Sequence, residues 1–151
     1  MSESSTPLYS SNFRHTLDDK NRITIPSAWR FTHGENDVLL AVPQPDGYIA
    51  VLPPPEAARV RAKFDEIKYG DRSGQDFAAI YFSRAQQMWC DKAGRIGLNL
   101  DLLTHAGIKP KSEVVLVGVS SKFFIYTPEH WERVQARTAA IMAETMNRLD
   151  I

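Results

Sequence analysis

The sequence of 151 residues contains one cysteine, no long apolar segment and no excess of either charge. A single cysteine, Cys90, excludes an intrachain disulfide framework and favours a reducing compartment. No segment approaches the roughly 18 apolar residues that a membrane-spanning helix needs. The first residues, MSESSTPLYSSN, lack the charged and apolar regions of a secretory signal. We therefore expect a cytoplasmic protein that does not contact a membrane.

The charges balance, with 18 basic and 18 acidic residues and a formal net charge of zero. This balance argues against a protein that coats nucleic acid through bulk positive charge. It leaves room for a small basic patch, because the local distribution of charge decides what a surface attracts. Any nucleic-acid function must therefore depend on where the cations lie.

Catalytic and metal-binding patterns are also missing. The sequence has no glycine-rich phosphate-binding loop, and Cys90 is predicted to be a small buried residue. The histidines have no metal-ligand spacing; they are His15, His33, His105 and His130. We predict that the chain is not an enzyme, holds no metal or cofactor, and has no small-molecule substrate.

What the chain does contain is an internal repeat. DDKNRITIPSAWRF begins at Asp18, and DKAGRIGLNLDLLT begins at Asp91. In both copies an aspartate stands four residues before an arginine, Arg22 or Arg95. A short alternating strand and then a helical segment, residues 27–33 or 100–106, follow each arginine.

The parallel continues downstream of both copies. Continuous apolar runs at residues 37–42 and 113–118 predict strands buried on both faces, and a second strand follows each run. Each copy then enters a long helix through proline, with Thr127 as a candidate N-cap of the second helix. The chain therefore divides into five predicted segments: a flexible tail (1–11), a first unit (12–54), connecting helices (55–83), a second unit (84–127) and a C-terminal helix (128–151).

Both long helices have apolar stripes at helical spacing, which predicts that they pack on the sheet. The first stripe is Ala57, Val60, Phe64 and Ile67; the second is Trp131, Val134, Thr138, Ile141, Thr145 and Leu149. The second stripe extends far along the chain, so an alternative for its distal end is contact with another subunit.

The D-x-x-x-R loops have two interpretations. Asn21 and Gly94 occupy matching positions and both tolerate positive φ, which predicts one tight turn shaped by Asp18 and Asp91. In the structural interpretation, each aspartate pairs with its arginine to close the turn, and Lys20 is only a solvent-exposed residue at the tip of the loop.

In the functional interpretation, Lys20 and Arg22 present cations to a phosphate or a base edge, and Lys92 and Arg95 form a comparable pair. Arginine suits this role because its planar fork donates two parallel hydrogen bonds. An exposed ion pair contributes only about 0–1 kcal/mol, so stability alone is a weak reason to form it twice.

These motifs resemble those of the MraZ family of bacterial transcriptional regulators. The resemblance rests on both D-x-x-x-R loops, on D-x-K-x-R-I-x-I-P at residues 18–26, on VVLVG at 114–118 and on FFIYTPEHW at 123–131. It implies an α+β fold: a double-split β-barrel made of two AbrB/SpoVT-like swapped-hairpin repeats, with added amphipathic helices.

The resemblance also implies a function. Members bind short direct repeats of double-stranded DNA upstream of the division and cell-wall gene cluster, as ring-shaped homo-oligomers of the cytoplasm and nucleoid. By position, the DNA-facing arginine of the first motif is Arg22, beside Lys20, and that of the second is Arg95.

This sequence departs from the family pattern in three places. Asn21 replaces a glycine, Asn99 replaces a proline that follows the second strand, and Gly97 weakens that strand. Asn99 is able to cap the following helix instead. The alternative function is an oligomeric protein-interaction scaffold or an antitoxin-like module of the same fold, with little DNA binding.

Overall fold

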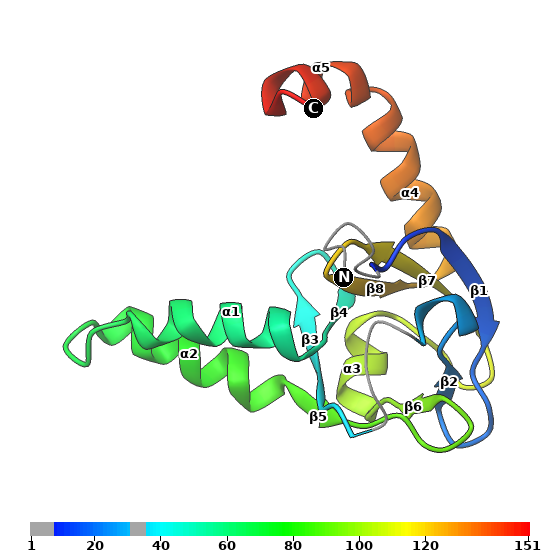
Figure 1. The fold of residues 1–151 in the computed structure, drawn as a ribbon, viewed down its shortest axis with the longest axis horizontal. Coiled ribbons are helices and arrows are strands. Elements are labelled where there is room, and N and C mark those ends of the chain that lie inside the picture. The colour runs from blue at the N-terminus through cyan, green and yellow to red at the C-terminus, as the bar shows by residue number, and fades with distance from the viewer. Residues whose placement is uncertain (1–7, 31–35) are drawn as a thin grey trace, which may run out of the picture.

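The computed structural model describes residues 8–30 and 36–151 (Figure 1). Its strands are β1 (Asn12–Thr16), β2 (Arg22–Thr24), β3 (Leu39–Gln44), β4 (Tyr48–Leu52), β5 (Gln86–Met88), β6 (Arg95–Gly97), β7 (Glu113–Val119) and β8 (Lys122–Tyr126). Its helices are η2 (Ser27–Trp29), α1 (Pro54–Asp65), α2 (Arg72–Arg84), α3 (Leu100–His105), α4 (Pro128–Ala139) and α5 (Met142–Leu149). The fold is therefore α+β, as predicted.

The strands form two antiparallel sheets. One has six strands in the order β1-β7-β8-β4-β3-β5, and the other is a two-stranded ribbon of β2 and β6. Two ladders, β3–β4 and β7–β8, join strands of the same half. The other four join strands of different halves: β1 pairs with β7, β8 with β4, β5 with β3, and β2 with β6. Neither half has a sheet of its own.

The main core lies between the six-stranded sheet, the β2–β6 ribbon and the short helices. Its largest side chain is Trp29, which is almost fully buried and whose Nε1 donates a hydrogen bond to the Ser10 carbonyl at 2.8 Å. Ile23 of β2 and Ile96 of β6 also reach this core and are fully buried. The ribbon is thus fixed to the core through one of its faces.

Tyr9, within the predicted tail of residues 1–11, is held against the sheet. Tyr9 is buried and pairs with Ser120 through backbone hydrogen bonds of 2.8 and 2.9 Å. The approach is close because residue 118 is glycine: a Cβ on Gly118 would overlap the backbone of Tyr9 and Ser10. Residues 1–7 of the tail, and 31–33 of the first predicted short helix, lie outside the described residues.

The long helices pack on the sheet only near their first turns, so the prediction that the apolar stripes pack on the sheet is wrong for the rest of the first stripe. Ala57 and Val60 contact a small cluster on the second face of the sheet, whereas Phe64 stacks on Phe77 of α2 at 5.4 Å. In Figure 1 the α1–α2 hairpin extends to one side, and α4 and α5 extend above the sheet. The predicted single C-terminal helix is two helices, interrupted at Ala140 and Ile141.

Two predicted caps are confirmed. The Thr127 side chain accepts a hydrogen bond from the backbone of His130 at the start of α4, and Asn99 caps α3 by accepting from Leu102. Arg137 of α4 also donates to Asp46 at 2.7 Å, which ties the helix to the β3–β4 turn. No helix in the described part of the chain is long and apolar enough to cross a membrane.

Candidate nucleic-acid interface

The first D-x-x-x-R loop is organised by the Asp18 carboxylate. Its Oδ1 accepts hydrogen bonds from the backbone N–H groups of Lys20 at 2.9 Å and Arg22 at 2.8 Å. Its Oδ2 accepts from Nε of Arg22 at 2.7 Å. One carboxylate therefore fixes both the turn and the direction of the arginine side chain.

The second loop repeats this pattern at the matching atoms. Oδ1 of Asp91 accepts from the backbone of Ala93 at 3.0 Å and of Arg95 at 2.9 Å, and Oδ2 accepts from Nε of Arg95 at 2.8 Å. Asn21 and Gly94 both adopt left-handed angles, with φ of 59° and 79°. Both copies therefore have an aspartate-centred turn with one positive-φ residue.

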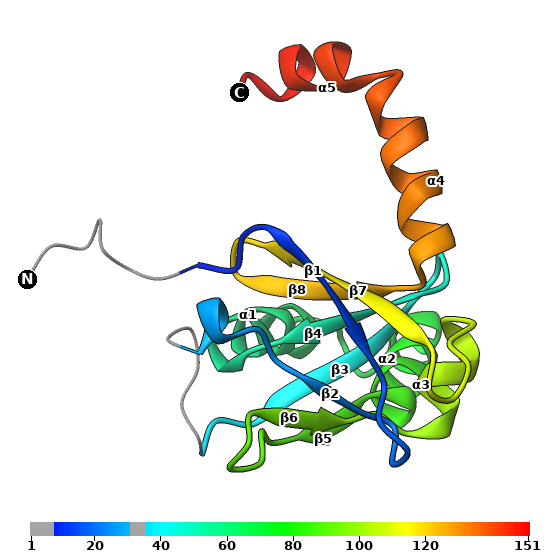
Figure 2. The same ribbon diagram turned by 90° about the vertical axis from the view of Figure 1, so that its right-hand side faces the viewer.

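The two loops also hold each other. The backbone N–H of Ile25, after β2, donates to the Gly94 carbonyl at 2.8 Å, and that of Leu98, after β6, donates to the Asn21 carbonyl at 3.1 Å. Figure 2 shows the loops at opposite ends of the ribbon, along the same lower edge of the molecule. The left-handed residue of each loop thus serves as an anchor for the strand that leaves the other.

The ribbon register places both arginines on its outward face. Arg22 lies opposite Gly97, and Arg95 lies opposite Thr24. Side chains alternate between the faces of a strand, so these four positions share one face, while Ile23 and Ile96 occupy the buried one. Arg22 and Arg95 are therefore diagonal neighbours across the ribbon. The Cα atoms of such a pair lie about 7–8 Å apart.

Each ion pair leaves part of the arginine available. Within the described residues, Asp18 and Asp91 engage the Nε atoms of Arg22 and Arg95, and the terminal Nη groups make no further hydrogen bond. Lys20 and Lys92 are exposed, at the two ends of the ribbon. The structural and functional interpretations are therefore compatible, because Nε closes the turn while the Nη groups remain for a ligand.

The carboxylates remain charged over the neutral range. Burial alone would raise the pKa of Asp18, but hydrogen bonds from Arg22 and Lys20 outweigh it and lower that pKa. The backbone hydrogen bond from Arg95 is the main cause of the lowered pKa of Asp91. Both ion pairs therefore persist at neutral pH.

The structure adds two residues to the second loop that no sequence pattern indicates. Arg30, which follows η2, lies against Gly94: a Cβ there would be 3.0 Å from Nη2 and 3.2 Å from Cζ of the guanidinium. The Gln86 side chain joins β5 to the end of β6, donating to the Gly97 carbonyl at 2.8 Å and accepting from the Asn99 N–H at 2.9 Å. Both contacts join distant parts of the sequence.

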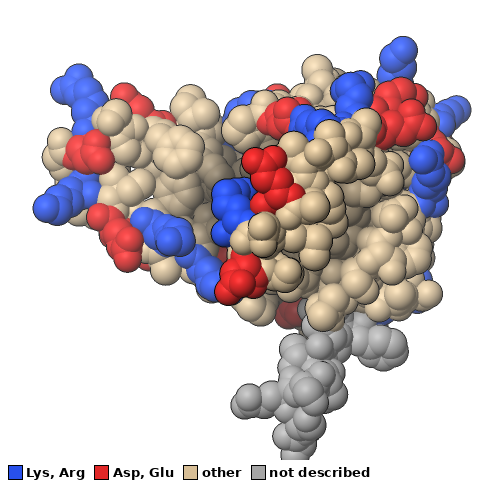
Figure 3. All heavy atoms as spheres, turned by 90° about the horizontal axis from the view of Figure 1, so that it is seen from above, with Lys and Arg blue, Asp and Glu red and all other residues tan. Residues whose placement is uncertain are grey.

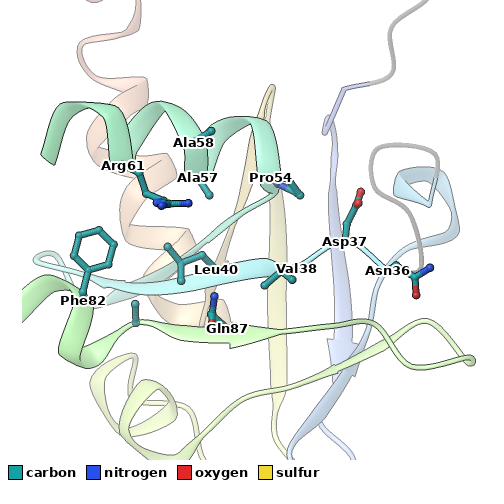
Figure 4. A pocket seen from close by; sticks show the side chains of 11 residues that line it. Asn36, Asp37, Val38, Leu40, Pro54, Ala57, Ala58, Arg61, Phe82 and Gln87 are labelled. Carbon is teal, nitrogen blue, oxygen red and sulfur yellow. The ribbon is translucent and has the colours of Figure 1, made fainter. Parts of the chain in front are cut away.

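The face seen from above and the cleft beside α1 are less suited to an anionic ligand. Figure 3 views the molecule from above, and on that face basic and acidic side chains are interspersed. A cleft of about 750 Å³ lies between α1 and the β3–β5 ladder (Figure 4). The charged side chains among its described lining residues are Asp37 and Arg61, at opposite ends, so the lining supplies no cluster of cations.

Known proteins resemble this chain over most of its length. A family model described as "MraZ protein, putative antitoxin-like" matches residues 81–150. A protein of Desulforamulus reducens is 32% identical over 88% of this chain and 91% of its own length. The chain belongs to the MraZ family. The residues that match the family model begin at the end of α2 and include the second loop, β7, β8 and the C-terminal helices.

Two further MraZ relatives cover most of the chain. A protein of Lactiplantibacillus plantarum is 30% identical over 88% of this chain and 92% of its own length. One from Clostridium acetobutylicum is 30% identical over 95% of this chain and 100% of its own length. All three relatives are named "Transcriptional regulator MraZ". Because each covers at least 88% of this chain, the similarity extends over both halves.

Proposed function

We propose that this protein is a sequence-specific DNA-binding transcriptional regulator. The observation that carries the proposal is the pair of arginines on the outward face of the β2–β6 ribbon, each held through Nε by its own aspartate. Holding the side chain in advance reduces the entropy lost on binding. The name of the MraZ relatives supports the same function.

The ribbon matches the shape of the ligand. The major groove of B-DNA admits a two-stranded β-ribbon, and the fork of an arginine pairs with O6 and N7 of guanine. In this proposal Arg22 and Arg95 contact base edges through their Nη groups. Lys20 and Lys92, at the ends of the ribbon, contact phosphates and set its position along the duplex.

We further propose that the fold is a double-split β-barrel of two swapped-hairpin units, residues 12–54 and 84–127. The pairing of strands from the two halves supports this, because each half completes the ladders of the other. The equivalent loops and their reciprocal hydrogen bonds support it too. Residues 55–83 then connect the units, and residues 128–151 form a C-terminal extension.

The protein is proposed to act as a ring-shaped homo-oligomer in the cytoplasm and nucleoid. It would bind direct repeats upstream of the division and cell-wall gene cluster. The apolar side chains exposed on and beside α5 favour subunit contacts: Ile141, Met142, Met146 and Leu149. A subunit with no net charge makes few phosphate contacts, so several subunits on successive repeats would gain affinity by avidity.

A second candidate function is a protein-interaction module of the same fold with little DNA binding. The α1–α2 hairpin favours it, since Phe77 and Ile80 are 58% and 64% exposed on the described surface. Large exposed apolar side chains that lie together mark contacts with other proteins. Neither candidate involves catalysis.

The two candidates predict different results in a gel-shift experiment. The probe is the DNA upstream of the protein's own gene, tested at two salt concentrations with wild type, Arg22→Ala and Arg133→Ala. Arg133 is an exposed arginine of α4, so its variant controls for the loss of one positive charge. Regulation through the ribbon predicts a salt-sensitive shift that Arg22→Ala weakens by about 5–150-fold and Arg133→Ala preserves. Absence of a shift with wild type would favour the interaction module.

A further inference from the structure

The two loops have the same backbone but different cations. In the first loop the tip residues are Asp19 and Lys20, which cancel in charge; in the second they are Lys92 and Ala93. The second loop also receives Arg30 from the first half of the chain, through the contact with Gly94. The second loop therefore carries three basic side chains and one aspartate, Asp91, which is already paired with Arg95.

The position of Arg30 is fixed by its neighbours. Trp29, the preceding residue, is almost fully buried, and the backbone N–H of Arg30 donates to the Ser27 carbonyl at 3.2 Å. The Arg30 side chain starts from this anchored turn and is exposed. Its guanidinium lies against Gly94, where any other residue would place a Cβ at 3.0–3.3 Å from Nη2, Cζ and Nε.

The first loop has no equivalent of this arrangement. Asn21 fills the position that Gly94 leaves open. The residue that stands as far after Arg95 as Arg30 stands after Arg22 is Leu103, which is buried in the core. The third cation is therefore specific to one end of the ribbon. Among the described residues, Arg30 has no ion pair that would occupy its guanidinium.

We propose that Arg30 and Lys92 form a phosphodiester-binding site at the second loop, next to Arg95, which is proposed to contact a base edge. The inference rests on the proposed DNA-binding function and adds a residue that the D-x-x-x-R motif does not contain. Guanidinium groups donate paired hydrogen bonds to phosphate oxygens, and a cluster of cations with one paired acid attracts a single anion. The second loop anchors the ribbon to the DNA backbone more strongly than the first, so the two ends of the ribbon are electrostatically unequal.

The test measures how the dissociation constant on the upstream DNA depends on salt. Each phosphate contact contributes about 0.9 to the slope of log K against log salt. We expect Arg30→Ala to reduce this slope by about 0.9 and to weaken binding several-fold at moderate salt. Arg30→Lys keeps the charge and should retain the slope, and Arg133→Ala should behave as wild type.

The outcomes separate this inference from the proposed function. If wild type binds and Arg22→Ala does not, but Arg30→Ala keeps the wild-type slope, the phosphodiester site is wrong and the proposed function stands. The same conclusion follows if Arg133→Ala lowers the slope as much as Arg30→Ala, because the loss then reflects net charge. If wild type does not bind, the proposed function itself fails. Thermal unfolding of Arg30→Ala should match wild type, since the side chain is exposed.

Discussion

The loops at residues 18–22 and 91–95 have the same internal hydrogen bonds but only two identical side chains, the aspartate and the arginine. The positions that determine the turn are therefore the aspartate, the arginine and the left-handed residue, Asn21 or Gly94. The positions that differ, Asp19–Lys20 and Lys92–Ala93, face solvent. Backbone geometry and surface charge are thus set by separate residues, and the charge of one loop can change without altering its shape.

The arginines themselves also sit in different surroundings. Arg22 lies opposite Gly97, so no side chain across the ribbon restricts it, whereas Arg95 lies opposite Thr24. Gly97, which the sequence marks as a weakness of the second strand, leaves space beside the arginine of the first loop. The departure from the family pattern in one half thus lies next to the arginine of the other half.

The largest expected effect comes from removing one arginine at a time. A bidentate arginine–guanine contact contributes about 1–3 kcal/mol of discrimination, so Arg22→Ala should relax base preference at its position and weaken binding about 5–150-fold. Arg95→Ala should lower affinity as well, with a different position losing its preference. Binding selection on randomised upstream DNA measures both. Identical preferences in the two variants would mean that the arginines do not read separate bases.

The second prediction concerns backbone strain in the two turns. Alanine in the left-handed region costs about 1–2 kcal/mol, and asparagine tolerates that region better than alanine does. Gly94→Ala should therefore destabilise the protein by about 1–2 kcal/mol, and more than Asn21→Ala, because its Cβ also meets Arg30. Denaturant unfolding gives both values. Equal losses would show that the Arg30 contact imposes no constraint.

The smallest effect is a pH dependence of the turns. The pKa values of Asp18 and Asp91 are lower in the folded protein than in the unfolded chain. Each ionised carboxylate therefore stabilises the folded protein fully above its unfolded-state pKa, and this stabilisation is lost as pH falls through its folded-state pKa. The stability difference between wild type and Asp91→Asn should be constant from pH 5 to 7 and shrink below about pH 4. A difference that disappears between pH 5 and 7 would contradict the assignment.

Much of this arrangement could be predicted from the sequence because it is local. Asp18 and Arg22 are four residues apart in one turn, so spacing alone indicates their pairing, and the capping by Asn99 and Thr127 is equally local. The helix packing was harder to predict. An apolar stripe such as the one containing Phe64 indicates that something covers it, but not whether the cover is the sheet or α2.

Contacts between distant parts of the chain could not be predicted from the sequence. Arg30 reaches Gly94 only because β2 pairs with β6, and no spacing in the sequence encodes that distance. The burial of Tyr9 depends in the same way on the absence of a side chain at Gly118. Both contacts involve a glycine whose missing Cβ admits a distant segment, which is a property of the assembled fold.

The most direct test is footprinting on the DNA upstream of the protein's own gene, with wild type and with the Arg22→Ala, Arg95→Ala double variant. The account predicts regularly spaced protection by wild type. The double variant should lose this protection while keeping the wild-type oligomeric mass and melting temperature. Wild-type protection by the double variant would contradict the claim that the outward face of the β2–β6 ribbon reads DNA.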